Sequence, residues 1–317
     1  MTLPGSGLPP AALPAQARAA LAARAEPATG RFLGASSFAA LLFLLDRARD
    51  GDEEAARLAF SVLRRTPGEG ATSACAAAAE AAVHVEAVDL RRDGGLEKTT
   101  RAAIDAALAA FGWNRDREEV DDRPRGSMDE GTDAHGLLIA TLARASVVLD
   151  APGYREAASW AGEQALDRRV DAKWGTLLHA GGEAPRPAGL GDYALLVLGL
   201  LELLAATGEK GWLHEAVRLQ GEQEERLWDV RDGGYFEAPE GAGRAAKKYG
   251  SDGSFVSGNG IATLNLIELS RMTGERGYRG RAERVLRAFA PEIAGEPLAH
   301  LTLLRAAQRL ARTAPAA

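Results

Sequence analysis

The sequence predicts an all-α protein folded as an (α/α)6 toroid, a closed ring of six helical hairpins with long loops on one face. The clearest hairpin runs from Asp192 to Leu227, where a fully apolar helix, a tight turn and a half-polar helix follow one another. The pattern returns from His135, from Ser257 and, more faintly, from Phe38, with a period of roughly 55 to 65 residues. Because one hairpin cannot bury its apolar face alone, neighbouring hairpins must stack.

The composition agrees with a helical fold. The 317 residues are rich in Ala, Leu, Arg and Glu and poor in aromatic residues, which favours helices over strands. Residues 1–10 are rich in Pro and Gly, so we expect a loose tail there. Residues 11–313 then form a single toroid domain.

Charge and motif content restrict the partners. The net charge of −6 is mild and spread along the chain, so we expect no nucleic-acid binding. No stretch reads as a signal peptide or as an uncharged membrane span, and we therefore expect a cytoplasmic protein without membrane contact. The single cysteine, Cys75, rules out an internal disulfide. No nucleotide-binding fingerprint is present, so we expect no cofactor. Assembly into a homo-oligomer stays open.

Twelve helices are expected in alternation. The six apolar helices should begin near Ser36, Ser73, Asp133, Asp192, Ser257 and Pro297. The six half-polar helices should begin near Ala11, Glu53, Leu96, Tyr154, Trp212 and Gly277. A half-polar helix opens the series and an apolar helix ends it, so the two ends can pair and close the ring. The alternative is an open, curved solenoid.

The connections are asymmetric, and this predicts the position of a site. Turns from an apolar to a half-polar helix are short, such as Thr207 to Gly211, whereas three of the return connections are long. Long loops inside a compact domain are uncommon and usually functional. In a ring they would gather where the apolar helices begin, around the free N–H groups of those helices. We expect a small-molecule site in that funnel.

Polar side chains cluster at the expected helix starts. We take Asp192, Asp252, His135 and His300 as catalytic candidates, because paired carboxylates serve glycoside chemistry and histidines move protons near neutral pH. The substrate-binding candidates are Tyr193, Lys248, Ser257, Asn259, Asp133 and Trp228. A purely structural role is the alternative, since Asp133, Asp192 and Ser257 are also good helix N-caps. The histidines lack zinc-site spacing, so we expect no metal.

These residues also carry a resemblance. The stretches GDYALLVLGLLELLAATGEKGWL, ERLWDVRDGGYF and KKYGSDGSFVSGNGIATLNLIELSRMTGERGY resemble the toroid domain of the spermatogenesis-associated thioredoxin-like proteins. That toroid is similar to N-acylglucosamine 2-epimerases and to six-hairpin glycosidases. Lys248, Asp252, Ser257 and Asn259 match the family pattern. The sequence has no counterpart of the family's thioredoxin-like domain, and only Asp192 remains of an aspartate pair.

Two functions follow from the resemblance and the residues. The first is a carbohydrate-active or related small-molecule enzyme, either an isomerase or epimerase or a hydrolase of the glycosidase type. The alternative is a non-catalytic binding or scaffold protein that has kept the ring and lost the chemistry.

Overall fold

The structure is a computed structural model of the 317-residue chain. It describes residues 7–9, 11–25, 32, 37–63, 73–113, 130–171, 173–180, 186–239, 247–253 and 255–313. Most of the expected tail over residues 1–10 lies outside these ranges.

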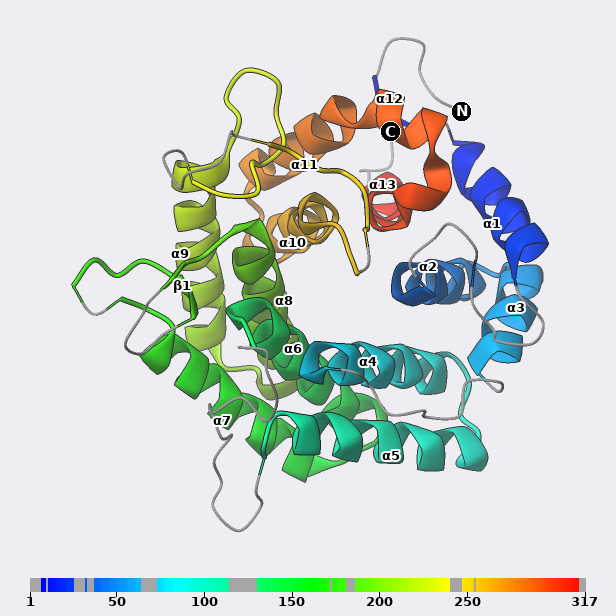
Figure 1. Cartoon of the computed structure of the whole chain (residues 1–317), viewed down its shortest axis with the longest axis horizontal. Coiled ribbons are helices and arrows are strands. Elements are labelled where there is room, and N and C mark those ends of the chain that lie inside the picture. The colour runs from blue at the N-terminus through cyan, green and yellow to red at the C-terminus, as the bar shows by residue number, and fades with distance from the viewer. Residues whose placement is uncertain are drawn as a thin grey trace. The chain divides into compact units, whose positions relative to one another are not determined.

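Helices make up nearly all of the regular structure of the described residues (Figure 1). The apolar helices are α2 (Ser37–Arg49), α4 (Ala74–Leu90), α6 (Thr132–Val148), α8 (Leu190–Thr207), α10 (Gly258–Thr273) and α13 (Leu301–Arg312). The half-polar helices are α1 (Leu13–Arg24), α3 (Glu53–Leu63), α5 (Gly94–Ala110), α7 (Pro152–Arg168), α9 (Lys210–Leu227) and α11 (Arg276–Ala288). All twelve predicted helices are therefore confirmed, in the predicted alternation.

The end of the chain departs from the prediction in one detail. The last apolar helix was expected to begin at Pro297, but Pro297–Ala299 form a short 3₁₀ helix, η1, after the extra helix α12 (Ala290–Gly295). Helix α13 begins only at Leu301, because His300 has a non-helical backbone with φ −128° and ψ 34°.

The long connection from 167 to 191 contains two short strands. Strand β1 (Leu178–Ala180) pairs with β2 (Arg186–Pro187) in antiparallel register, with Leu178 opposite Pro187. A second hairpin-like turn joins Trp228 to Tyr235 through a single antiparallel bridge. Its tip uses left-handed backbone at Gly233 and Gly234, with φ of 78° and 79°, which glycine adopts without strain.

The chain divides into two compact units. Unit 1 contains residues 1–66 and 224–317, and unit 2 contains residues 67–223. The expectation of a single domain over 11–313 stays a prediction.

Unit 2 is built around the close packing of α6 on α8. A Cβ on Gly136 of α6 would lie 2.4 Å from the backbone carbon of Leu195, and one on Gly199 of α8 would lie 2.8 Å from the Gly136 oxygen. No side chain fits at either position, so the two helix backbones touch. Their first turns, which carry Asp133 and Asp192, therefore lie next to each other.

Helix α8 is long and apolar enough to span a membrane. We expected no such stretch from the sequence. Its 18 residues have a mean hydropathy of 1.7. However, 61% of the helix is buried inside the protein, as in the core helix of a folded domain.

In unit 1, helices α2, α10 and α13 pack together, and α11 packs against α10 (Figure 1). Two contacts connect chain segments far apart in sequence. The Arg305 guanidinium on α13 binds the Asp46 carboxylate on α2 at 2.8 Å, and the Phe38 ring stacks on Phe255 with ring centroids 4.9 Å apart.

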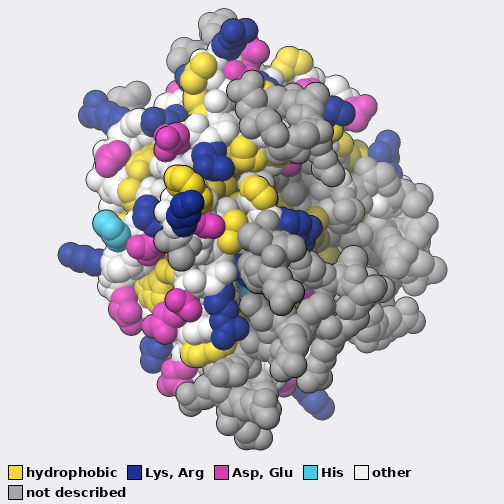
Figure 2. Space-filling model, turned by 60° about the vertical axis from the view of Figure 1, so that its left-hand side comes forward, with side chains coloured by type: hydrophobic (Ala, Val, Ile, Leu, Met, Phe, Trp, Pro, Cys, Tyr) yellow, Lys and Arg dark blue, Asp and Glu magenta, His cyan; other side chains and the backbone are white. Residues whose placement is uncertain are grey.

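Acidic and basic side chains are intermixed on the part of the surface that Figure 2 shows. This agrees with the mild net charge of −6.

Candidate functional site

Three helix N-termini meet in unit 2. The Glu130 carboxylate, just before α6, accepts a hydrogen bond from the Ala74 N–H at the start of α4, at 3.2 Å. The Asp192 carboxylate in the first turn of α8 accepts one from the Asp133 N–H in the first turn of α6, at 3.0 Å. Helices α4, α6 and α8 thus begin beside one another. The expectation that all six apolar helices begin around one funnel stays a prediction.

Asp192 is the centre of this arrangement. Its side chain is buried, and its Oδ2 accepts the Gly189 N–H at 2.8 Å, in the manner of a capping box. Its Oδ1 accepts both the Asp133 N–H and the Nδ1–H of His179, the latter at 2.8 Å. Three N–H donors therefore hold one carboxylate, and the carboxylate in turn fixes the orientation of an imidazole.

His179 reaches Asp192 because β1 is tied to the start of α6. The Thr132 hydroxyl donates to the Leu178 carbonyl oxygen at 2.6 Å. The imidazole lies directly on Gly131, where an added Cβ would be only 2.1 Å from the His179 Cε1. Only glycine leaves room for the ring at this position. The ring remains 28% exposed, and its Nε2 is the nitrogen not engaged by Asp192.

Asp133 completes the group. Its Oδ1 accepts the Ala134 N–H at 2.9 Å. Burial, together with the nearby Asp192 charge, raises the pKa of the Asp133 carboxyl. The hydrogen bond from His179 to Asp192 raises the pKa of the imidazole. We call Asp133, His179 and Asp192 the acid–base trio, because two of its members hold protons at higher pH than such groups usually do.

The same three side chains are the group with metal-ligand spacing among the residues that the structure describes, with ligand atoms within 4.8 Å of one another. Two hydrogen-bonding features limit metal binding at Asp192 and at the Nδ1 of His179. Asp192 already accepts three N–H donors, and a cation bound at His179 Nδ1 would have to replace the proton that this nitrogen donates. The trio suits proton transfer better than metal ligation.

Cys75, on α4, faces the same acidic neighbourhood. Burial, with the charges of Asp133 and Glu130, raises the pKa of its thiol to about 12. A thiol that stays protonated is a poor nucleophile, so the raised pKa does not favour Cys75 as a nucleophile.

Two further predicted residues of unit 2 have partners of their own. The His135 Nδ1 lies 3.0 Å from the Gly131 carbonyl oxygen, and its ring meets Phe111 edge-on. The Tyr193 side chain is fully buried, and its hydroxyl donates to the Glu222 carboxylate at 2.5 Å. Tyr193 thus connects α8 to α9.

In unit 1, Asp252 joins two helix starts. Its Oδ1 accepts the Ser257 N–H at 3.0 Å and its Oδ2 accepts the Thr302 N–H at 3.1 Å. Burial raises the pKa of this carboxyl, although the hydrogen bonds oppose the rise. Ser257 is the N-cap of α10, and its hydroxyl accepts the Gly260 N–H at 3.1 Å.

Asn259 and Lys248 hold the turn that precedes α10. The Asn259 amide accepts the Tyr235 N–H at 2.8 Å and donates to the carbonyl oxygens of Tyr235 and Tyr249. The Lys248 ammonium binds the Asp229 carboxylate and the Gly233 carbonyl oxygen. Burial raises the pKa of the Asp229 carboxyl, but this ammonium and two backbone N–H groups lower it by more, so the pKa lies below its usual value.

The last two predicted residues of unit 1 are also engaged. The Trp228 ring meets Tyr235 edge-on and lies under the Arg284 guanidinium, 5.1 Å from the ring centroid. His300 is buried, and its Nδ1 lies 2.8 Å from the Glu296 carbonyl oxygen. Glu237, which the sequence did not single out, has a pKa raised by burial to about 6.

Each unit therefore gathers some of the predicted residues. Asp133 and Asp192 come together in unit 2, whereas Asp252 and Ser257 come together in unit 1. His179 is the residue that sequence reasoning missed. It is one histidine in a turn-rich loop, and no spacing pattern links it to Asp192.

Comparison with known proteins adds sequence and fold relationships. No family model matches the chain. Human spermatogenesis-associated protein 20 is 38% identical over 120 residues, which are 37% of this chain and 15% of the human protein. This segment is homologous to spermatogenesis-associated protein 20. The mouse protein matches equally, at 38% identity over 119 residues. The chain thus aligns with only a small part of these relatives.

Solved structures agree with the predicted fold over almost the whole chain. A D-mannose isomerase superposes with a TM-score of 0.71 at 12% identity, over 99% of this chain and 100% of that one. An unsaturated glucuronyl hydrolase specific for heparin gives 0.71 at 13% identity, over 95% and 96%. Cellobiose 2-epimerase from Bacillus thermoamylovorans gives 0.65 at 9% identity, over 84% and 81%. The chain has the (α/α)6 toroid fold of these enzymes.

Proposed function

We propose that the protein is a carbohydrate-active enzyme of the isomerase or epimerase type, with Asp133 and His179 as its acid–base pair. The observation that carries the proposal is the hydrogen bond of 2.8 Å between His179 and the buried Asp192, beside a second carboxyl whose pKa is raised. The homology and the sugar-processing enzymes that share the fold support this kind of function.

The chemistry needs one base and one acid at a sugar carbonyl. Asp133 takes the proton from the carbon next to the carbonyl, and the electron pair of that C–H bond forms an enediol double bond. The carbonyl oxygen accepts a proton from His179 Nε2, whose charge Asp192 stabilises. When Asp133 returns its proton to the former carbonyl carbon and His179 recovers a proton from the neighbouring hydroxyl, the product is the isomer. Formation of the epimer requires in addition a proton donor on the opposite face of the original carbon, so this pair by itself accounts for isomerisation.

The trio favours this chemistry over glycoside hydrolysis. A hydrolase needs two carboxylates that both reach the substrate. Asp192 is only 4% exposed and accepts three N–H donors, so it is poorly placed to attack a sugar or to activate water. Its role is to position His179.

The test is proton exchange at the sugar carbon next to the carbonyl. Mannose, glucose, cellobiose and N-acetylglucosamine are incubated with the protein in D₂O, and deuterium incorporation is followed by NMR. We expect exchange with one of these sugars and a loss of about 100-fold in Asp133→Asn and in His179→Gln. Asp167→Asn and His214→Gln, which change exposed residues of the same unit, serve as matched controls. Equal exchange rates in all four variants would overturn the proposal.

A non-catalytic binding protein is the second candidate, and unit 1 favours it. Asp252, Ser257 and Asn259 all bind backbone groups, and a protein can keep such residues for structure alone. This candidate predicts no exchange with any sugar, together with a rise in melting temperature when a sugar binds.

A further inference from the structure

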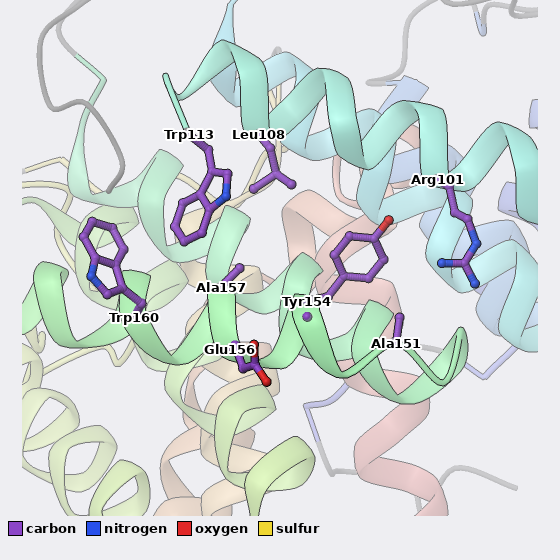
Figure 3. Close-up of a pocket in the computed structure, with 9 residues that line it drawn as sticks. Arg101, Leu108, Trp113, Ala151, Tyr154, Glu156, Ala157 and Trp160 are labelled. Atoms are coloured by element: carbon purple, nitrogen blue, oxygen red, sulfur yellow. The ribbon is translucent and has the colours of Figure 1, made fainter. Parts of the chain in front are cut away.

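A cleft lies in unit 2 between α5 and α7, and none of the residues that line it belongs to the acid–base trio. Its volume is about 580 Å³, and it is lined chiefly by Arg101, Leu108, Trp113, Tyr154, Glu156 and Trp160. Figure 3 shows Trp113 at the end of α5 and Trp160 on α7 facing the same space, with Arg101 at the opposite end. We call it the tryptophan cleft.

The two indole rings form a corner. Their centroids are 5.3 Å apart and their planes meet at 81°. Trp113 is directed there because α5 ends at Phe111, Gly112 takes left-handed backbone with φ 72°, and the Trp113 N–H returns to the Leu108 carbonyl oxygen at 2.9 Å. Two aromatic faces at a right angle can cover one face and one edge of a ring-shaped ligand.

The rest of the cleft is polar, and its charges balance. Arg101 uses one N–H on the Leu149 carbonyl oxygen at 3.3 Å, and a guanidinium has five such donors. Glu156 is exposed and offers acceptors, and Figure 3 shows the Tyr154 hydroxyl directed towards α5. One cation and one anion line the cleft, so it lacks the net positive charge that a phosphate or sulfate group would need.

We propose that the tryptophan cleft binds a neutral oligosaccharide, as a site separate from the acid–base trio. Sugar rings present C–H groups that pack on aromatic faces and hydroxyls that both donate and accept. The cleft offers aromatic faces beside an Arg donor and a Glu acceptor. A proline-rich peptide also uses aromatic grooves, but proline residues have no N–H group to donate to the Glu156 carboxylate. The proposal shares the sugar class with the proposed function, but it needs no catalysis.

Gly153 is a position where a side chain can be added at the cleft without a steric clash. Gly153, in the first turn of α7, lines the cleft, and a Cβ added there would meet nothing within 4 Å. Gly153→Leu therefore adds a bulky side chain at the wall of the cleft without a clash at its Cβ.

The test is calorimetric titration of the full chain with mannotetraose, cellotetraose, a heparin tetrasaccharide and a decaproline peptide. We expect one neutral tetrasaccharide to bind, with a loss of tenfold or more in both Trp160→Ala and Gly153→Leu. Trp174→Ala, which removes a tryptophan that is 72% exposed and outside the cleft, should bind as the wild type does. Binding of the peptide alone, binding of no saccharide, or wild-type affinity in both cleft variants would overturn the proposal.

His179→Gln separates this inference from the proposed function. If the proposed function fails but the cleft inference holds, the wild type exchanges no sugar proton, and both the wild type and His179→Gln bind the tetrasaccharide with the same affinity. If the cleft inference fails alone, exchange depends on His179 and the cleft variants bind as the wild type does.

Discussion

Asp192 and Asp252 have the same structural role in the two units, but their further hydrogen-bond partners differ. Each is a buried carboxylate that accepts N–H groups from two chain segments at helix starts. The hydrogen bonds to Asp252 come from residues at the starts of α10 and α13, such as Ser257 and Thr302, whereas Asp192 also holds the imidazole of His179, which is 28% exposed. The difference teaches that a structural cap becomes a candidate catalytic element when a titratable side chain that water can reach is added to it.

The largest expected effect separates the two carboxylates by activity. His179→Gln removes the proton donor and should lower the rate of sugar proton exchange by about 100-fold or more. Because the ring is 28% exposed, the melting temperature should change little. Exchange assays and thermal unfolding on the same preparation check both numbers, and a large fall in melting temperature with proportional loss of activity would make His179 structural.

Asp252→Ala should do the reverse. It leaves the N–H groups of Ser257 and Thr302 without their acceptor, at a cost of about 1–3 kcal/mol each. We expect the free energy of unfolding to fall by roughly 2–6 kcal/mol in urea titration. The activity of the folded fraction should stay unchanged. Glu225→Ala, at an exposed position, is the control and should stay within about 0.5 kcal/mol of the wild type. An Asp252→Ala variant with the same free energy of unfolding as the wild type would show that the Asp252 carboxylate is not needed for stability.

Gly131→Ala tests the fit of the imidazole. The new methyl group would lie 2.1 Å from His179 Cε1, so the ring must move and its hydrogen bond to Asp192 must lengthen. We expect a loss of about tenfold in exchange rate, which corresponds to about 1.4 kcal/mol. Gly211→Ala, where nothing lies within 4 Å of the new atom, should keep full activity. Full activity in Gly131→Ala would argue that the ring position is unimportant.

The pH dependence of stability gives a smaller effect. The folded-state pKa values of His179 and Asp133 are both raised, so folding holds protons that the unfolded chain releases earlier. The His179 contribution is fully present below its ordinary pKa and is lost as pH rises through the higher folded value. Since the ring is partly exposed, we expect at most about 1 kcal/mol. The wild type should lose stability relative to His179→Gln on going from pH 6 to pH 8, and a gain would contradict the assignment.

The smallest expected effect is that of metal removal. If the trio transfers protons, dialysis against EDTA should leave exchange activity and melting temperature unchanged, and added Zn²⁺ or Mn²⁺ should not increase the rate. Loss of activity with EDTA and recovery with one of these ions would assign the ligand atoms within 4.8 Å of one another to a metal site instead.

The helices could be predicted from the sequence because their signals are local. The apolar run of α8 and the left-handed Gly208 that ends it, with φ 74°, both follow from neighbouring residues. Ser257 was expected as an N-cap and is one. Asp192 and Asp133 were expected in the same role, but they are the third residue of α8 and the second residue of α6, and the N-caps there are Gly189 and Gly131. The late start of α13 could not, because it depends on the Asp252 carboxylate reaching the Thr302 N–H from 50 residues away.

The site was predictable only in part. Asp133 and Asp192 stand at helix starts that the pattern reveals, so their meeting followed from the packing of parallel hairpins. His179 lies on a three-residue strand without periodicity, and its contact with Asp192 needs the hairpin to fold back onto Gly131. Tyr193 and Asn259 were expected to bind substrate, but burial directs them to Glu222 and to backbone groups, which sequence alone does not show.

The pKa of His179, measured by NMR titration of its imidazole, tests the central claim most directly. The account predicts a value above the ordinary 6.5 in the wild type, a clear fall in Asp192→Asn, and no change in Asp252→Asn. A wild-type value at or below 6.5, or a value that Asp192→Asn leaves unmoved, would show that Asp192 does not hold a protonated imidazole and would contradict the assignment of this trio to proton transfer.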